Sequence, residues 1–146
     1  LDCRGADATY IACGAISTAQ ADFPGRLQEI FARVRALVAE YRPTEIAIER
    51  VFVNKNVDSA LKLGQARGAA LCGAFESAAQ VFEYSPREIK MAVVGSGAAD
   101  KRQVQHMVKA LLSLQQRLNA DAADALAVAL CHVHGRRVRQ LMAASS

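Results

Sequence analysis

The sequence predicts an α/β fold, and three observations lead to this class. Short apolar, β-prone stretches are separated by longer stretches in which apolar residues recur at helical spacing. Their order is strand, helix, strand, helix, strand and then helices. A strand that is flanked by helices in the sequence favours a parallel or mixed sheet with helices packed against it.

Three strands are expected, at residues 9–16, 44–51 and 80–84. The polar stretch before the first strand contains Gly5, which marks a hairpin turn whose own first strand is barely present or absent. In the second strand, isoleucines alternate with Ala47 and Glu49, so Glu49 lies at the carboxyl end. Ligands bind at that end of the strands in open α/β sheets, which makes Glu49 a candidate site residue. The alternative is an ordinary solvated glutamate at a strand end.

Helices are expected over residues 26–41, 57–79, 86–94, 100–114 and 119–133. The sequence Asp22-Phe23-Pro24-Gly25 is expected to break the chain before the first of these. Gly64, Gly68 and Gly73 lie inside the second helix, where each costs about 1 kcal/mol relative to alanine. Close packing against the sheet or a second subunit would compensate for this cost. Residues 135–146 are expected to be a frayed, flexible tail.

Length and composition bound the class further. A chain of 146 residues fits one domain with its own core, so residues 1–146 are expected to form a single domain. The sequence has no secretory signal and no apolar run long enough to cross a bilayer. Its four cysteines form no Cys-x-x-Cys pair and are interpreted as reduced, mostly buried thiols of a cytoplasmic protein. The formal net charge of +4 permits a polyanionic partner without requiring one.

Two carboxylates open the last expected helix, in the sequence Asn119-Ala120-Asp121-Ala122-Ala123-Asp124. Their spacing of three residues sets Asp121 and Asp124 on one helical face, and the alanines between them allow a close approach to a neighbour. The simplest alternative is that Asn119 caps the helix and that the aspartates meet the positive end of its dipole. Our hypothesis is that this face is half of a metal site and that Glu49 faces it. Oxygen-only ligands favour Mg²⁺, with Mn²⁺ as a possible substitute.

Such a site suits hydrolysis of a phosphodiester, because two ions about 4 Å apart can activate water and stabilise the leaving oxygen. Basic side chains would then hold a DNA or RNA backbone, although each alone is more often a solvated charge. The candidates are Lys55, Lys62, Lys90, Lys101 and Arg102. Phe52, in a polar loop, could stack on an unpaired base or fold back onto the core. His132 and His134 lie on different sides of the last helix, so they are interpreted as structural or surface residues.

Three stretches resemble the RuvC family of Holliday-junction resolvases, which belongs to the ribonuclease-H-like nucleases. They are residues 46–68 (IAIERVFVNKNVDSALKLGQARG), 83–108 (EYSPREIKMAVVGSGAADKRQVQHMV) and 119–134 (NADAADALAVALCHVH). The resemblance implies a ribonuclease-H-like mixed sheet flanked by helices. It also implies an Mg²⁺-dependent endonuclease that acts as a homodimer beside a branch-migration motor and resolves four-way DNA junctions by paired symmetric nicks in recombination and repair.

The resemblance also implies roles for single residues. Glu49, Asp121 and Asp124 match three of the family's four catalytic acids, which hold the metal ions. Lys90 and Lys101 match basic residues close to the scissile phosphate, and these five residues are the predicted catalytic set. The predicted DNA-binding residues are Phe52, which matches an aromatic that stacks at the junction, together with Lys55, Lys62, Arg67 and Arg102.

The sequence departs from the family in one respect. The fourth acid of the family lies in an Asp-Pro-Gly motif on the first strand, and this sequence has no such motif. Asp2 and Asp7 precede turn-like residues and are not assigned that role. We therefore expect that the first strand is missing from the chain by truncation. The alternatives to the resolvase are a catalytically impaired junction-binding module and a related nuclease that acts on RNA or on other branched DNA.

Overall fold

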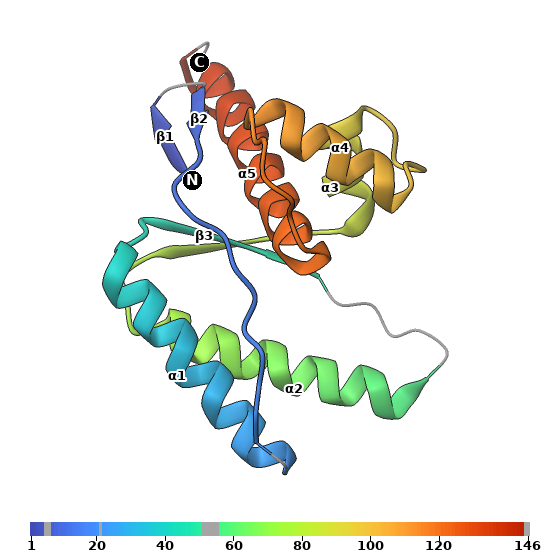
Figure 1. The fold of residues 1–146 in the computed structure, drawn as a ribbon. Coiled ribbons are helices and arrows are strands. Elements are labelled where there is room, and N and C mark those ends of the chain that lie inside the picture. Colours follow the sequence, from blue (N-terminus) through green and yellow to red (C-terminus); the bar gives the residue numbers. More distant parts are fainter. Residues whose placement is uncertain (5–6, 21, 51–55, 145–146) are drawn as a thin grey trace. The chain divides into compact units, whose positions relative to one another are not determined.

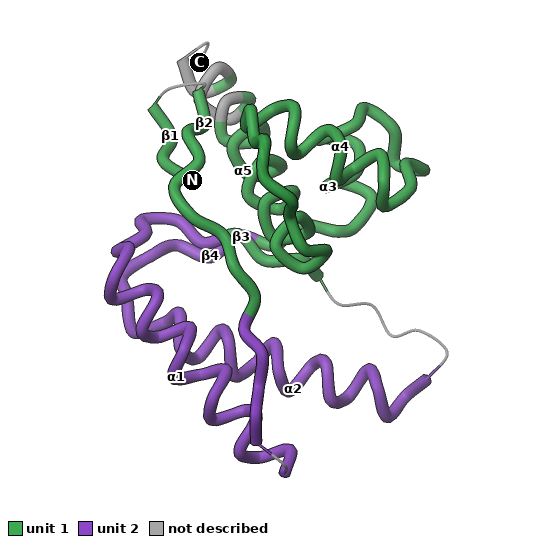
Figure 2. The backbone as a smooth tube through the Cα atoms, viewed as in Figure 1, with its two compact units in different colours: residues 1–15, 47–50, 83–146 green, residues 16–46, 51–82 purple. Residues whose placement is uncertain are grey.

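The computed structural model describes residues 1–4, 7–20, 22–50 and 56–144, except for the side chains of residues 137, 139–141 and 143–144. The chain divides into two compact units (Figure 2). Unit 1 contains residues 1–15, 47–50 and 83–146, and unit 2 contains residues 16–46 and 51–82. Within the described ranges, none of the helices is long and apolar enough to span a membrane.

The elements alternate as the α/β prediction requires (Figure 1). In chain order they are β1 (Asp2–Arg4), β2 (Asp7–Thr9), α1 (Phe23–Tyr41), β3 (Glu45–Glu49), α2 (Val57–Ala74), β4 (Gln80–Tyr84), α3 (Pro86–Val94), α4 (Lys101–Leu111) and α5 (Ala120–Ala144). The expected single domain of residues 1–146 stays a prediction.

The strands form two small sheets. β1 and β2 make an antiparallel hairpin in which Asp2 lies opposite Thr9. β3 pairs with β4. The amide of Gln80 donates to the carbonyl of Thr44 (3.1 Å), and the amide of Arg50 donates to the carbonyl of Tyr84 (2.8 Å). The first bond joins the starts of the two strands and the second joins their ends, so β3 and β4 run parallel.

The prediction of a strand at residues 9–16 is wrong. Residues 10–20 have no regular secondary structure, although the hairpin turn expected near Gly5 is reflected in the short pairing of β1 with β2. A strand is stable only when a neighbour pairs with its backbone. Among the residues that the structure describes, no strand pairs with residues 10–16, so β-propensity alone does not order them.

Local capping explains where the helices differ from expectation. α1 begins at Phe23 rather than residue 26, because the side chain of Asp22 accepts a hydrogen bond from the Gly25 amide (3.2 Å) and Pro24 suits a first helical turn. α2 ends at Ala74 rather than at residue 79. At this end, the hydroxyl of Ser77 donates a hydrogen bond to the carbonyl of Ala74 (3.0 Å). α4 is shorter than expected by one residue at its start and three at its end.

α5 continues well past its expected end near residue 133, so residues expected to be a tail are helical as far as Ala144. The single glycine in this stretch, Gly135, costs only about 1 kcal/mol. Arginine, leucine, methionine and alanine, which follow it, are good helix formers and outweigh that cost.

In unit 2, α1 and α2 pack closely at one glycine. A Cβ atom at Gly73 would lie 2.6 Å from the carbonyl oxygen of Phe31 and 3.1 Å from the amide nitrogen of Arg35. Close packing therefore compensates at Gly73 as expected, but the partner is α1 and neither the sheet nor a second subunit. At Gly64 and Gly68 a Cβ atom would meet nothing within 4 Å, so no described part of the chain packs on them.

The core of unit 1 lies among α3, α4 and α5. Its most buried members include Val108, Ala123 and Ala127, and partly buried residues of the N-terminal segment and β3 pack against it. All four cysteines are free, as expected. Cys131 is buried, and burial raises the pKa of its thiol to about 11. Cys3 and Cys13 are only half-buried and Cys72 is exposed, so the expectation of mostly buried thiols is wrong. Cys72 lies one turn after Gly68 on α2, where an added Cβ atom would meet nothing within 4 Å.

Candidate active site

Glu49 ends β3 within unit 1 and lies in a field of other charges. Its pKa is raised from the ordinary value of 4.5, first by desolvation and then by the negative charge of Asp124. The ammonium groups of Lys101 and Lys90 act in the opposite direction and lower it. Charged groups on three helices, α3, α4 and α5, therefore act on Glu49.

Asp121 and Asp124 lie in the first two turns of α5, as predicted. Asn119 precedes the helix, and its side-chain oxygen accepts the amide hydrogen of Ala122 (2.7 Å), so the expected cap is confirmed. Ala122 and Ala123 are buried on the core side. These small residues let α5 pack closely, while Asp121 is exposed and Asp124 is half-buried.

Lys101 contacts Asp124 directly and is also subject to the charges of the other two acids. It opens α4, where Asp100 and Gln103 form a capping box. The Lys101 Nζ donates to Asp124 Oδ2 at 2.9 Å. The pKa of Lys101 is raised chiefly by this hydrogen bond and by the charge of Asp124, with further contributions from Asp121 and Glu49. The structure thus brings the five residues of the predicted catalytic set into one electrostatic cluster within unit 1.

The predicted DNA-binding residues are placed less completely. Phe52 and Lys55 lie outside the described residues. Lys62 and Arg67 lie on α2 in unit 2, and Lys62 is paired with Asp58 (2.7 Å). Arg102 is exposed on α4, next to Lys101.

The fit of this cluster to a metal ion depends on how many protein ligands the ion needs. Within the described ranges, no three His, Cys, Asp or Glu side chains gather closely enough to hold an ion on their own. Mg²⁺ is commonly bound by one or two carboxylates, with water and substrate phosphate completing its shell. Glu49 and Asp124 supply such oxygen donors, and their mutual repulsion is what a bound cation would relieve. The donor set therefore fits Mg²⁺.

One contact near the site was not predicted. Tyr84, the last residue of β4, forms a hydrogen bond between its hydroxyl and Nδ1 of the buried His132 on α5 (2.7 Å). This hydrogen bond links α5 to the end of β4, where the Tyr84 carbonyl also accepts from the amide of Arg50. His134 is also structural, because its Nδ1 lies 3.0 Å from the carbonyl oxygen of Ala92. In the sequence, His132 stands inside an apolar helical stretch. That pattern indicates a buried polar side chain but does not indicate its hydrogen-bond partner.

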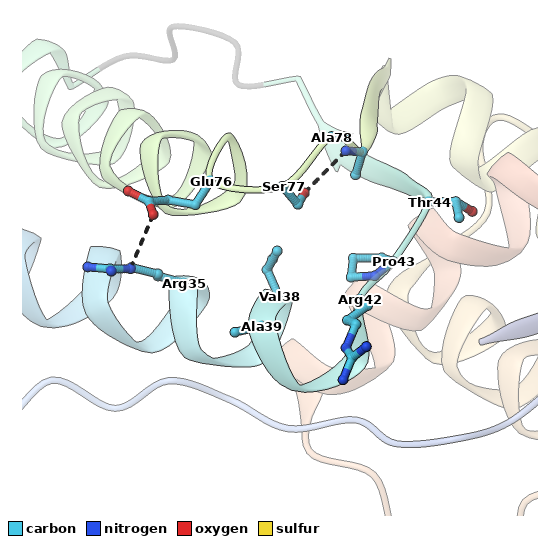
Figure 3. Close-up of a pocket in the computed structure, with 10 residues that line it drawn as sticks. Arg35, Val38, Ala39, Arg42, Pro43, Thr44, Glu76, Ser77 and Ala78 are labelled. Atoms are coloured by element: carbon cyan, nitrogen blue, oxygen red, sulfur yellow. Dashed lines mark hydrogen bonds and ion pairs between the residues drawn. The ribbon is translucent and has the colours of Figure 1, made fainter.

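A hollow of about 570 Å³ in unit 2 contains none of the predicted site residues (Figure 3). It lies between the end of α1 and the segment after α2. Arg35 and Glu76 pair across it at 3.3 Å, and Val38, Pro43 and Ala78 provide much of its apolar lining. It has no carboxylate cluster and is not part of the candidate active site.

Comparisons with known proteins identify the family. A family model described as crossover junction endodeoxyribonuclease RuvC matches residues 1–132. The crossover junction endodeoxyribonuclease RuvC of Shewanella frigidimarina is 54% identical over 134 residues, which are 92% of this chain and 78% of that protein. That of Marinobacter nauticus is 58% identical over 125 residues, which are 86% of this chain and 71% of that protein.

The solved structures agree. Thermus thermophilus RuvC in complex with Holliday junction substrate matches with a TM-score of 0.77 at 36% identity, over 84% of this chain and 74% of that one. A second Thermus thermophilus RuvC structure gives a TM-score of 0.75 at 35% identity, over 85% and 75% of the two chains. The ribonuclease-H-like fold class expected from the sequence is thereby confirmed. The chain belongs to the RuvC family of crossover junction endodeoxyribonucleases.

Proposed function

We propose that this chain is a metal-dependent endonuclease that resolves four-way DNA junctions by paired symmetric nicks. The observation that carries the proposal is the 2.9 Å hydrogen bond from the Lys101 ammonium group to Asp124, on which the charges of Glu49 and Asp121 also act. Clustered acids with neighbouring lysines suit a site that binds both a divalent cation and the anionic phosphate to be hydrolysed. The relative from Thermus thermophilus, which was solved with a Holliday junction substrate, supports DNA of this shape as the substrate.

The residues divide the work by charge. Glu49, Asp121 and Asp124 would contribute oxygen ligands to the cation, for which we propose Mg²⁺, with Mn²⁺ as a substitute, and water and substrate phosphate would complete its shell. When bound, the cation supplies Lewis-acid polarisation of the phosphate and activation of water. Lys90 and Lys101 neutralise the phosphate. Because a carboxyl group must be ionised to bind a metal, the raised pKa of Glu49 predicts that metal affinity rises with pH through that pKa.

We propose that the enzyme is a homodimer that associates through α2. Val57, Leu61, Gly64 and Gly68 follow one another at helical spacing, and the side chains of Val57 and Leu61 are 65% and 62% exposed. The two glycines face open space, which would admit a second backbone. The remaining DNA contacts are assigned to Phe52, Lys55, Lys62, Arg67 and Arg102, the protein is assigned to the cytoplasm, and a branch-migration motor is the implied partner.

The test is cleavage of a synthetic four-way junction in Mg²⁺. Asp121→Asn and Asp124→Asn should each reduce the rate at least about a hundredfold, since each removes a charge that stabilises the transition state. Asp7→Asn is the matched control, because Asp7 is an exposed aspartate of β2 and is not assigned a role in the site. It should cleave as the unsubstituted chain does. Symmetric cuts that persist in both α5 variants would reject the assignment.

A binding-only function is the second candidate. It predicts salt-sensitive junction binding with no cleavage in Mg²⁺ or Mn²⁺. Comparing four-way, three-way, duplex and DNA–RNA hybrid substrates in the same assay separates the resolvase from a nuclease of other specificity.

A further inference from the structure

Helix α4 carries basic side chains on the face opposite its buried face. Val104 and Val108 are buried against the rest of unit 1. At 100° per residue, Arg102, His106 and Lys109 all lie on the other side of the helix. Arg102 and His106 are exposed and Lys109 is partly exposed. We call these three residues the α4 cationic stripe.

The stripe has no acid to balance it. α4 contains no acidic residue among its 11, and Asp100, which precedes it, is engaged as the N-cap. Within the described ranges, none of the three stripe residues forms an ion pair, and neither does the exposed Arg117 in the segment after α4. The end of the stripe borders a hollow of about 360 Å³. This hollow is lined by His106, Lys109, Ala110, Ser113, Leu114 and Gln115.

Helix stability does not account for this arrangement. A cation near the carboxyl end of a helix is favourable, which explains Lys109. A cation in the first turn is unfavourable, because it faces the positive end of the dipole, and yet α4 begins with Lys101 and Arg102. Lys101 is accounted for by its bond to Asp124, but Arg102 has no such partner among the residues that the structure describes. An anionic ligand outside the chain would supply it.

The spacing of the stripe suits a nucleic-acid backbone. At 1.5 Å per residue, Arg102 and Lys109 lie about 10 Å apart along the helix axis. A strand of duplex DNA advances 3.4 Å per nucleotide, so the same length covers about three phosphates. The stripe starts next to Lys101, whose ammonium binds Asp124, and it extends from there towards the carboxyl end of α4.

From this we propose that the α4 cationic stripe, with Arg117, binds the phosphate backbone of the duplex arm that leads away from the point of cleavage. The inference rests on the proposed function and names a DNA-binding surface in addition to the active site. His106 contributes an imidazole N–H donor, and the arginines and the lysine contribute charge-assisted hydrogen bonds to phosphate oxygens.

The test is the affinity for a fluorescent four-way junction without divalent metal, measured over a range of salt concentrations. The variant combines Arg102→Gln, Lys109→Gln and Arg117→Gln. The dissociation constant should rise at least about tenfold at 0.1 M salt. The slope of log affinity against log salt should become shallower by about 2 to 3, because each phosphate contact contributes about 0.9.

A control variant removes the same number of positive charges elsewhere. It combines Arg4→Gln, Arg26→Gln and Arg42→Gln, three exposed arginines on the N-terminal hairpin and on α1 or its end. We expect a loss of less than about threefold, since none of these arginines belongs to the proposed stripe and an isolated exposed charge is screened by salt. Equal losses in the two variants would mean that only net charge matters, and the stripe would be rejected.

Other outcomes separate this inference from the proposed function. If the unsubstituted chain cuts the junction and the stripe variant binds it with unchanged affinity, the resolvase assignment stands and the stripe is wrong. If the stripe variant loses affinity but no form of the chain cuts, the stripe stands and the resolvase assignment fails. If the unsubstituted chain does not bind the junction at low salt, the proposal that the α4 cationic stripe binds DNA is wrong.

Discussion

Gly73→Ala tests the packing of α1 on α2 with a single added methyl group. The new Cβ atom would lie 2.6 Å from the carbonyl oxygen of Phe31, closer than an ordinary contact by about 0.8 Å. It would also lie 3.1 Å from the amide nitrogen of Arg35 and 3.2 Å from Cβ of Val34. Two of these neighbours are backbone atoms of a helix, so they cannot rotate away as a side chain would.

Two opposing effects set the size of the change. Alanine in place of glycine inside a helix gains about 1 kcal/mol. Inserting a methyl group into a packed interface costs about 1 to 3 kcal/mol, and rigid backbone neighbours favour the upper part of that range. The variant should therefore lose about 1 to 2 kcal/mol of unfolding free energy. For a chain of this size, that lowers Tm by roughly 2 to 8 °C.

The same helix provides matched controls. Gly64→Ala and Gly68→Ala place their methyl groups in open space, so each should gain up to about 1 kcal/mol. Urea unfolding followed by circular dichroism measures all three variants, and the midpoint should move without a change in slope. Repeating it over a range of protein concentrations separates helix stability from association through α2. A neutral or stabilised Gly73→Ala would refute the reasoning, because contact with the Phe31 carbonyl must then be avoidable.

Three further substitutions have expected results. Tyr84→Phe removes the hydrogen bond to the buried His132 and should cost about 1 to 2 kcal/mol in urea unfolding; no loss would mean that water replaces the hydroxyl. Glu49→Gln should stabilise the metal-free protein at pH 7 by less than about 1 kcal/mol, since the group is exposed and screened. Because the folded pKa of Glu49 is raised, the stability of the unsubstituted protein should increase as pH falls through that pKa towards 4.5, and the variant should lack this increase. Ser85→Ala should cost about 1 kcal/mol at neutral pH through loss of the α3 cap, and an unchanged midpoint in thermal melts would contradict it. The lowered pKa of Glu88 in the same capping box adds stability above pH 4.5 that should be lost as pH falls through the folded pKa.

The elements that the sequence predicted well carry their signals locally. β4 and α3 begin and end where expected, since Ser85 caps α3, Pro86 suits its first turn and Gly95 ends it with a positive φ of 82°. The strand expected at residues 9–16 failed for the opposite reason. Whether an apolar stretch becomes a strand depends on a neighbour elsewhere in the chain, and no local pattern contains that information.

The candidate site shows the same division. The spacing of Asp121 and Asp124 could be read directly from the sequence, because helix periodicity fixes which face they share. The hydrogen bond of Lys101 to Asp124 joins residues 23 apart in the chain, and that of Tyr84 to His132 joins residues 48 apart. The resemblance to RuvC indicated the importance of Lys101, whereas nothing in the sequence paired Tyr84 with His132.

The charges at the site are arranged at a cost to folding, which distinguishes them from ordinary surface ion pairs. The Lys101–Asp124 pair is about half exposed on both sides, so it contributes little stability. Glu49 is held where its ionised form is disfavoured by desolvation and by Asp124. Glu49 and Asp124 repel one another, and Lys101 is bonded to Asp124, so a bound cation would relieve the repulsion of the acids, as the proposed hydrolysis of a DNA backbone requires.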